Sequence, residues 1–512
     1  MMKQNDYMNI PKEKFEFVGR GEKIFDRKLE TKPIGYFKDA FIRFRKNKSS
    51  VVAAIIILIL ILYAIIAPIF SPFTVDSRDP YYATVLPKNR LLAQYGIWDG
   101  TTQKQEAIGG YHLALALGQE SGIPVIIGDV EAVDNGQGGF LYRYKADTYA
   151  AVGYAYLDVS LEEFERIQAW QDETGTLVCY PIPESEKTNY LIANGGAGFW
   201  YKLKNERQNS TGEAKLDKDG NLIPNYKLSS TPDSRYTSTV RYAGDGDNGQ
   251  YYLYGKKVQG DNVRIRVLYS AYYEYVNGHE ASFLFGTNAY GQDIYTCLAA
   301  GARLSFILAL SVSAINLTIG AIYGAIEGYY GGTTDIVMER ISDILASVPF
   351  MVVVTLFKLH LAEKVGALPS LLFAFVLTGW VGMAARVRMQ FYRFKGQEYI
   401  LAARTLGAKD GRLMFKHIFP NSIGTIITGS VLVIPGVIFS ESSLSYLGII
   451  NLETSSLTSV GTLLSQGQGY LSTYPHIIFF PALFIALLEI SFNLFGNGLR
   501  DAFNPSLRGV EE

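Results

Sequence analysis

The sequence is poor in cysteine and has no excess of charge of either sign. Two cysteines in 512 residues, Cys179 and Cys297, are too few for a disulfide framework, so we expect two unlinked thiols, with one disulfide as the alternative. The formal net charge of −1 argues against a nucleic-acid partner, which would need a strongly basic surface. The sequence also contains no Gly-x-x-x-x-Gly-Lys-Ser/Thr phosphate loop, so we expect that this chain does not hydrolyse ATP.

The N-terminus lacks the features of a cleavable signal peptide. Residues 1–49 contain 13 lysines and arginines, a charged region that is far too long for such a signal. The following run from Val51 to Phe70 has no charged residue, and a helix needs about 20 apolar residues to cross the hydrocarbon layer. We therefore predict a cytoplasmic arm over 1–49 and an uncleaved transmembrane helix over 50–72.

Aromatic residues in this arm have helical spacing. Phe37, Phe41 and Phe44 recur at intervals of four and three residues among lysines and arginines. One interpretation is an amphipathic helix that lies in the membrane interface and contacts lipid. The other is a plain positively charged anchor on the cytoplasmic side. The spacing does not decide between them, and both can hold.

Long apolar runs return only after residue 300. They predict a polytopic α-helical membrane protein with six transmembrane helices, the last five over 303–328, 341–362, 368–386, 422–447 and 474–498. Lysine and arginine concentrate in cytoplasmic loops. The 386–421 segment holds eight of them and 448–473 holds none. We therefore expect both termini and 386–421 in the cytoplasm, and 73–300 and 448–473 outside.

The polar middle is long enough for a domain of its own. Alternating residues near 139–144 and 263–269 predict strands, and 161–171 predicts a short helix with Ser160 as its N-cap. We expect an extracytoplasmic α+β domain over 73–282, inserted between the first two spans. Asp217 to Asn221 resembles a calcium loop, but a hairpin turn is favoured because Leu228 stands where a Glu is needed. The many tyrosines favour packing over a carbohydrate or peptide platform.

The segment 398–421 between the fourth and fifth spans has an unusual composition for a cytoplasmic connection. Four small residues leave a surface that another protein can approach closely: Ala402, Ala403, Gly407 and Ala408. Pro420 is expected to end the second of two short helical stretches. Four apolar side chains are candidates to fill a groove on a partner: Leu401, Leu406, Leu413 and Phe415.

This segment resembles the EAA loop of ABC importer permeases, which reads Glu-Ala-Ala, three residues, Gly, nine residues, then Ile-x-Leu-Pro. The corresponding positions here are Leu401-Ala402-Ala403, Gly407, and His417 to Pro420. Leu401 stands where the pattern has Glu, which removes one possible ion pair with an ATPase. The run Ala402-Ala-Arg404-Thr-Leu-Gly-Ala408 and the ending His417-Ile-Phe-Pro-Asn resemble the peptide and nickel branch of the family.

Further segments agree with that branch. They are Phe285 to Asp293, Gly301 to Ser305, Gly328 to Gly332, Glu441 to Gly448 and Asn493 to Asp501. The resemblance covers about 33–75 and 283–508 and is strongest to the C-type subunit. It implies the six-helix permease fold of type I ABC importers over 283–508 and the first span, in a bacterial plasma membrane.

The resemblance also implies a set of partners. They are a second, B-type permease, two ABC ATPase subunits, an extracytoplasmic substrate-binding lipoprotein and an oligopeptide substrate. ATP and Mg²⁺ would be used by the ATPases, and we expect no cofactor and no metal on this chain. The 398–421 loop would couple to an ATPase through Leu401, Ala402, Ala403, Arg404, Gly407, Ala408, His417 and Pro420.

Ionisable residues inside spans are candidates for the translocation path. Glu489 lies in the sixth span and Lys358 in the third. Alternatively, these two pair with each other, or Lys358 extends toward the outer surface. Glu441 matches the family pattern as either a packing or a gating residue.

Two other functions compete with the permease interpretation. A membrane-anchored adhesion or sensing domain would not need the 398–421 pattern, and a transporter working alone would show internal repeats. Within the branch, nickel or glutathione are alternatives to peptides as the substrate.

Overall fold

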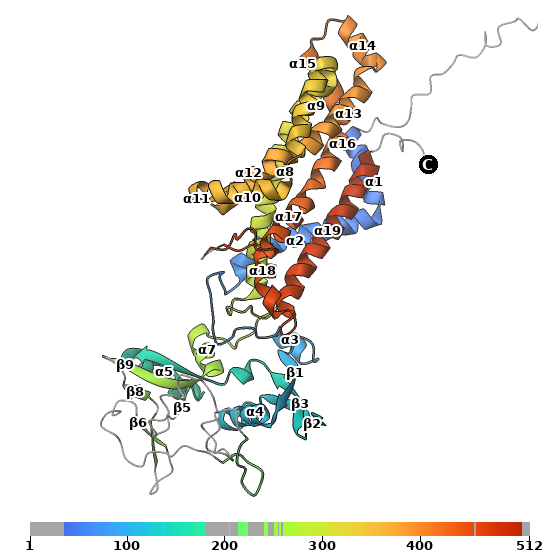
Figure 1. The fold of residues 1–512 in the computed structure, drawn as a ribbon. Coiled ribbons are helices and arrows are strands. Elements are labelled where there is room, and N and C mark those ends of the chain that lie inside the picture. Colours follow the sequence, from blue (N-terminus) through green and yellow to red (C-terminus); the bar gives the residue numbers. More distant parts are fainter. Residues whose placement is uncertain are drawn as a thin grey trace, which may run out of the picture.

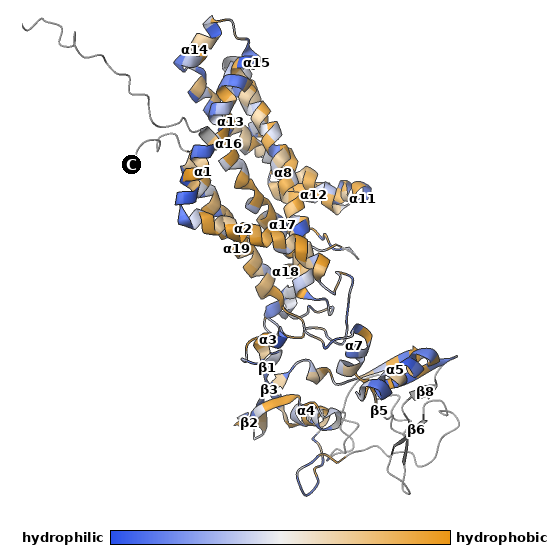
Figure 2. Cartoon of the chain, turned by 180° about the vertical axis from the view of Figure 1, so that it is seen from behind, coloured by the Kyte–Doolittle hydropathy of each residue, from blue (hydrophilic) through white to orange (hydrophobic). Residues whose placement is uncertain are grey.

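The structure is a computed structural model that describes residues 35–136, 138–180, 204, 213–223, 240–243, 250–253, 255–257, 260–454 and 457–503. The predictions for 1–34 and 504–512, and the calcium-loop position Leu228, lie outside these residues. Long helices form a bundle, and strands with shorter helices form a second region at one end of it (Figure 1). Figure 2 shows that apolar residues dominate the bundle helices, whereas α14 and the strand region are more polar.

Five helical stretches in the described residues are long and apolar enough to cross a membrane. The first is α2, Lys48–Phe70, and the second is α8, Ile294–Tyr330. The third joins α12, Ala367–Gly379, to α13, Val381–Lys395. The fourth runs from Asp410 to Tyr446, and the last is α19, His476–Phe503. The molecule therefore has the character of a multi-pass helical membrane protein.

A sixth span exists only if a bent pair of helices is counted as one. Helices α9, Gly332–Ala346, and α10, Phe350–His360, meet at an angle of 71°. The prediction of one helix over 341–362 was therefore wrong. Pro349 has no backbone N–H and disfavours helical geometry in the preceding residue, so the chain turns at 347–349.

Close helix packing in the bundle depends on glycines. At Gly324 of α8 an added Cβ would lie 2.1 Å from the carbonyl oxygen of Ala384 on α13, and Gly320 and Gly328 meet α13 in the same way. Small residues of this kind let membrane helices approach closely. A short helix, α18 (Val460–Gly467), packs just as tightly, because Gly461 would clash with Ser442 of α17 (Val433–Tyr446) if it carried a side chain.

The region between α2 and α8 contains both strands and helices. Its first sheet has the antiparallel order β1-β3-β2 and its second joins β4, β9, β5 and β8, while β6 pairs with β7. The strands are β1 Thr101–Ala107, β2 Ile126–Asp134, β3 Phe140–Asp147, β4 Tyr154–Ser160, β5 Cys179–Tyr180, β6 Val240–Ala243, β7 Gln250–Leu253, β8 Gly255–Lys257 and β9 Asn262–Leu268. The helices are α3 Arg90–Ala93, α4 Ile108–Ser121, α5 Leu161–Thr174 and α7 Tyr269–Asn277.

Several local predictions for this region are confirmed. The two predicted strands correspond to β3 and β9, and the predicted helix is α5, whose N-cap Ser160 accepts a hydrogen bond from the Glu163 amide. Asp217 caps a hairpin turn, because its side chain accepts hydrogen bonds from the amides of Asp219 and Asn221. Cys179 and Cys297 are buried and are not joined by a disulfide.

The strand region is fastened to the bundle by a buried turn before α8. Thr287 accepts a hydrogen bond from the Val85 amide through its hydroxyl oxygen, and its carbonyl lies 3.2 Å from the ring of His476 at the start of α19. Tyr82 is fully buried beside Tyr149, Tyr273 and Phe283, so aromatic packing continues into the strand region. This confirms the packing interpretation for these tyrosines.

Candidate functional site

The 398–421 segment lies at the end of the bundle opposite the strand region (Figure 1). Helix α14, Glu398–Thr405, is followed by a turn, by the one-turn helix α15, Asp410–Arg412, and by a wider π-helical turn, Leu413–Ile418. The turn is made at Gly407, whose φ of +84° favours glycine. An added Cβ there would meet nothing within 4 Å, so the surface beside Gly407 is open in this chain.

One face of this segment exposes apolar side chains to solvent. Leu406 is 88% exposed, and Leu401 and Phe415 are about half exposed. Ala402, Arg404 and Gly407 are exposed on the same segment, while Ala403 and Ala408 are partly buried. Leu413 is 0% exposed, so the expectation that it fills a groove on a partner was wrong.

The opposite face of the segment anchors it to the bundle. Ile400, Leu413 and Ile418 are fully buried and belong to one hydrophobic cluster with α8 and α13 residues, including Ala325, Tyr329, Val387 and Phe391. The spacing of the three inward residues leaves the intervening positions free to face outward. Segment 398–421 therefore has one side packed on the bundle and one side exposed to solvent.

A polar triad ties the two halves of the segment to the end of α8. The Tyr329 hydroxyl donates to Asp410 of α15 at 2.5 Å and accepts from the Arg404 guanidinium of α14 at 3.3 Å. Helix α8 has 37 residues, about 55 Å at 1.5 Å per residue, and so extends well beyond a hydrocarbon layer of about 30 Å. That length brings Tyr329 to the segment.

A second polar cluster joins the neighbouring helices. Arg388 of α13 forms two hydrogen bonds with Asp335 and two with Glu339, both on α9, at 2.6 to 3.1 Å. Its guanidinium also lies 3.5 Å from Glu327 of α8. Bidentate arginine–carboxylate pairs are geometrically restrictive. The cluster therefore fixes α8, α9 and α13 relative to one another close to the segment.

The end of the segment continues directly into a membrane helix. Pro420 lies in the first turn of α16, Phe419–Val431, where a missing N–H costs little. Contrary to the prediction, Pro420 therefore does not interrupt the helical stretch, but the next membrane helix does begin beside it, as expected. Just before it, His417 offers its carbonyl oxygen to the Asn421 side chain at 2.8 Å. Movement of the segment would be transmitted along α16 without a flexible hinge.

Glu441 is buried between helices of this chain. It lies on α17, Val433–Tyr446, and is 1% exposed. Its two carboxylate oxygens accept hydrogen bonds from Ser305 of α8 at 3.0 Å and from Ser445 at 3.1 Å. A buried carboxylate needs such partners. The geometry favours the packing role over an open path for this residue.

Glu489 and Lys358 are placed differently. Glu489 is half-buried on α19, and its Oε1 atom is buried without a hydrogen-bond partner in the described chain. Lys358 is exposed in the last turn of α10. Among the described residues no ion pair joins Glu489 to Lys358. The alternative that these two residues pair with each other was therefore wrong.

Glu489 belongs to a strip of small and polar residues along one face of α19. Its members recur every three or four residues and all are exposed or half-exposed: Ala482, Ala486, Glu489, Asn493 and Asn497. The neighbouring exposed strip is wholly apolar: Leu483, Leu487, Ile490 and Leu494. A membrane helix with these two strips has one side suited to lipid and one suited to water or protein.

The residues that hold the segment in place were not found from the sequence. Tyr329 and Arg388 were noted only as part of a glycine-rich pattern and as a positive charge, and Asp335 was not noted at all. Their partners are 49 to 81 positions away along the chain. Arg388 lies just beyond the predicted span 368–386, among the other positive charges of 386–421, so no local signal set it apart.

Comparison with known proteins decides the family. A family profile described as "Binding-protein-dependent transport system inner membrane component" matches residues 316–509. A second, "N-terminal TM domain of oligopeptide transport permease C", matches 35–91. The oligopeptide transport system permease protein OppC of Bacillus subtilis is 44% identical over 224 residues, which are 44% of this chain and 72% of that protein. This chain belongs to the peptide ABC importer permeases, as a C-type subunit.

Other relatives of the permease agree. The dipeptide transport system permease protein DppC of Bacillus subtilis is 39% identical over 229 residues, covering 44% of the permease and 70% of that protein. An inward-facing structure of the MetNI methionine ABC transporter matches 41% of the permease and 96% of its own chain, with 14% identity and a TM-score of 0.34, and no conclusion rests on it. Residues 92–315 of the permease lie outside both family profiles.

Proposed function

We propose that the permease forms, with a second B-type permease, the path by which oligopeptides cross the membrane, and that segment 398–421 docks on a cytoplasmic ABC ATPase. The observation that carries this proposal is the exposed apolar face of the segment, with Leu406 88% exposed beside the open turn at Gly407. An exposed leucine cluster on a rigid support is what a groove on a partner recognises.

The anchoring of the segment supports a lever mechanism. Its buried face is packed on α8 and α13, its polar triad holds the end of α8, and its C-terminal end continues into α16. Displacement of the segment by two ATPases that close on ATP and Mg²⁺ would therefore tilt these helices together. Rigid-body movement of this kind changes which side of the membrane the path opens to.

The polar strip of α19 is the part of this permease that we propose lines the translocation path. Glu489 has an unpartnered carboxylate oxygen, and such an acceptor suits the ammonium group of a passing peptide. Lys358 lies at an exposed helix end, where it would meet the other charged end of the substrate. We assign no cofactor or metal to this chain.

The orientation follows from the same proposal. Docking on cytoplasmic ATPases requires 398–421 and both termini in the cytoplasm of a bacterial cell. The strand region, at the opposite end of the bundle, then lies in 73–300 outside the membrane (Figure 1). There it would meet the lipoprotein that delivers the substrate.

The proposal is tested by Leu406→Asp in the assembled importer. Leu406 is nearly fully exposed, so a charge there leaves the fold intact but should be buried and unpaired at the docking surface. We expect the amount of ATPase that co-purifies with the permease to fall at least tenfold while the second permease is retained.

The matched control is Leu91→Asp, another leucine that is 74% exposed, in the strand region. It should leave the ATPases bound. Retention of wild-type amounts of ATPase by Leu406→Asp would contradict the proposed docking surface. This substitution is preferable to one at Gly407, where a side chain would strain the backbone as well.

A further inference from the structure

The strand region contains a cavity of about 470 Å³ that is lined by residues at the end of β3 and at the end of β9, which belong to two different sheets. Its walls come from the end of α4, the end of β3, the chain before β5, helix α7, and the segments next to the membrane at 82–88 and 280–281. This volume lies in the range of small-molecule sites, which often occur between structural units. The residues that line it from Ser121 onward lie outside both family profiles.

The charges around the cavity do not balance. Three carboxylates line it, Asp147, Glu274 and Glu280, against a single cation, Lys88. The Lys88 ammonium is already engaged, because it lies 3.9 Å from Asp147 and 4.6 Å from the ring centre of Tyr149. In contrast, the carboxylates of Glu274, which is half-exposed, and Glu280, which is exposed, have no hydrogen-bond or ion-pair partner in the described chain.

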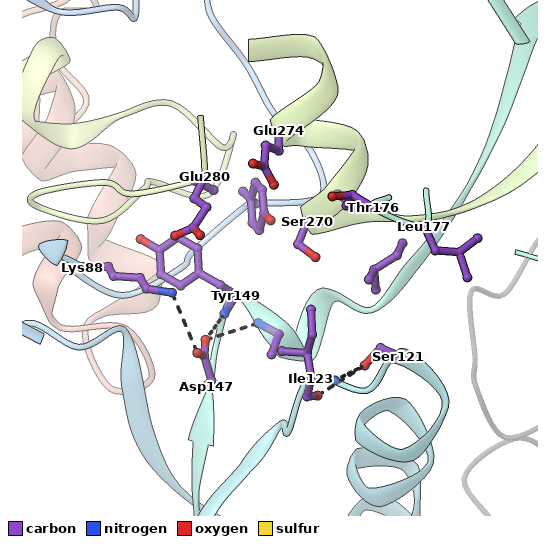
Figure 3. Close-up of a pocket in the computed structure, with 15 residues that line it drawn as sticks. Lys88, Ser121, Ile123, Asp147, Tyr149, Thr176, Leu177, Ser270, Glu274 and Glu280 are labelled. Carbon is purple, nitrogen blue, oxygen red and sulfur yellow. Dashed lines mark hydrogen bonds and ion pairs between the residues drawn. The ribbon is translucent and has the colours of Figure 1, made fainter. Parts of the chain in front are cut away.

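Figure 3 shows how these groups are arranged. Glu274 and Glu280 lie on one side of the space, and Asp147 and Ser121 lie on the other. Ser270 and Thr176 present hydroxyl groups that make no hydrogen bond elsewhere in the described chain. The remaining wall is apolar and includes Ile123, Leu177, Leu268 and Ala271.

A buried hydroxyl gives independent evidence of a missing partner. Tyr82 lines the cavity and is 0% exposed, yet its hydroxyl has no hydrogen-bond partner in the described chain. Buried polar groups in native proteins are nearly always paired with protein, water or ligand. The Tyr82 hydroxyl is shielded from solvent, so it marks unsatisfied polarity beside the cavity, while the cavity surface itself carries the two unpaired carboxylates.

We propose that this cavity binds a small organic solute through a primary ammonium group, with Glu274 and Glu280 as acceptors and the apolar wall around the organic part. Two uncompensated negative charges select a cation, and opposite charges discriminate strongly against neutral analogues. The described residues contain no group of three His, Cys, Asp or Glu side chains able to hold a metal ion, which favours an organic cation.

Two sources of such an ammonium group can be distinguished: the amino end of a short peptide, or a simple amine. The probes are trialanine, N-acetyl-trialanine and putrescine, and binding is measured by calorimetry on the full-length permease in detergent. We expect trialanine to bind and acetylation to weaken binding at least tenfold. Tighter binding of trialanine than of putrescine would assign the site to peptides, and the reverse would assign it to amines.

Variants place the binding in this cavity. Glu274→Gln and Glu280→Gln keep the side-chain shape and should each weaken binding of the better probe about tenfold. Glu165→Gln is the control, because Glu165 is exposed on α5 and does not line the cavity. Equal binding of trialanine and its acetylated form, or wild-type affinity in both cavity variants, would overturn the proposal. No ATPase or receptor is needed, so the result is independent of the coupling proposal.

Discussion

Single glycines decide how closely the bundle helices approach. Gly324→Ala would place a methyl group 2.1 Å from the Ala384 carbonyl oxygen, and backbone atoms cannot yield as a flexible side chain would. Overpacking of this kind costs about 1–3 kcal/mol. We therefore expect the purified Gly324→Ala variant to have a lower midpoint of thermal unfolding than the wild type. The midpoint can be measured with a fluorescent dye that reports unfolding without reacting with cysteine thiols.

Gly382→Ala is the matched control for that substitution. Gly382 is a helical glycine on α13, and an added Cβ there meets nothing within 4 Å. Alanine is the better helix former by about 1 kcal/mol in a helix interior, so this variant should be neutral or slightly stabilising. Equal destabilisation by both substitutions would contradict the close approach of α8 and α13.

A buried histidine predicts local sensitivity to acid. His112 of α4 is 5% exposed, and its Nδ1 atom accepts a hydrogen bond from the Ala214 amide at 2.9 Å. Burial lowers the pKa of His112 below its usual value of about 6.5. Because the folded state disfavours the proton, this contribution to stability is complete above that value and declines as pH falls below it.

The hairpin over 213–223 should therefore loosen in acid. Ala214 and Leu222 pack on Ala116 of α4, and protonation of Nδ1 would remove the hydrogen bond beside this contact. We expect amide hydrogen exchange in 213–223 to quicken between pH 7.5 and 5.5, after correction for the intrinsic rate. His112→Gln should abolish that pH dependence. Unchanged protection of the 213–223 amides from exchange in the wild-type permease over this pH range would contradict the proposed effect of His112.

At the scale of elements, the Tyr329 hydroxyl is the link between α8 and both halves of segment 398–421. Tyr329→Phe removes this link but keeps the buried ring, so segment 398–421 should still dock. We expect ATPases to co-purify normally, while peptide uptake per ATP hydrolysed falls severalfold in proteoliposomes. Loss of the ATPases instead would assign Tyr329 to docking, not to transmission.

The adjacent Tyr330→Phe is the control for that experiment. Tyr330 is 56% exposed and its hydroxyl makes no hydrogen bond in the described chain. Its removal should leave both uptake and ATPase binding unchanged. An equal loss of coupling in the two variants would contradict a specific role for the Tyr329 hydroxyl.

The spans were predictable because an uninterrupted apolar run has few alternatives to a membrane helix. Their ends were not, since α8 begins nine residues before the predicted start at 303, with a buried Ile294 and small residues that read as loop. The bend at 347–349 was missed because hydropathy averages over a window and does not register one proline. Short strands such as β3 were found from alternation alone.

The structure of segment 398–421 was predictable only in part. Of the four small residues expected to leave an open surface, Ala402 and Gly407 are exposed, whereas Ala403 and Ala408 are partly buried against the bundle. Which leucine faces outward was not predictable, because Leu406 and Leu413 are seven positions apart on two different helical pieces. The anchors Tyr329 and Arg388 depend on contacts between distant helices, which no local pattern encodes.

At the scale of the whole molecule, the strand region leaves and rejoins the bundle at one point. The Lys88 amide donates to the Phe283 carbonyl at 2.8 Å, and the Ser282 hydroxyl donates to the Lys88 carbonyl at 3.0 Å. The chain segment that enters the strand region and the segment that leaves it are therefore adjacent. Residues 90–280 can be replaced by a short Gly-Ser linker without separating α2 from α8.

This deletion tests what the strand region contributes to transport. The turn at Thr287 keeps its contacts with Val85 and His476, so the bundle should fold and segment 398–421 should still retain the ATPases. If the region receives the substrate-bearing lipoprotein, uptake that depends on this receptor should fall at least tenfold, measured with a labelled peptide in cells. Uptake at the wild-type rate would show that the region is dispensable for delivery. Loss of the ATPases would instead reveal that the bundle had misfolded, because the proposed docking surface lies at the opposite end of the molecule (Figure 1).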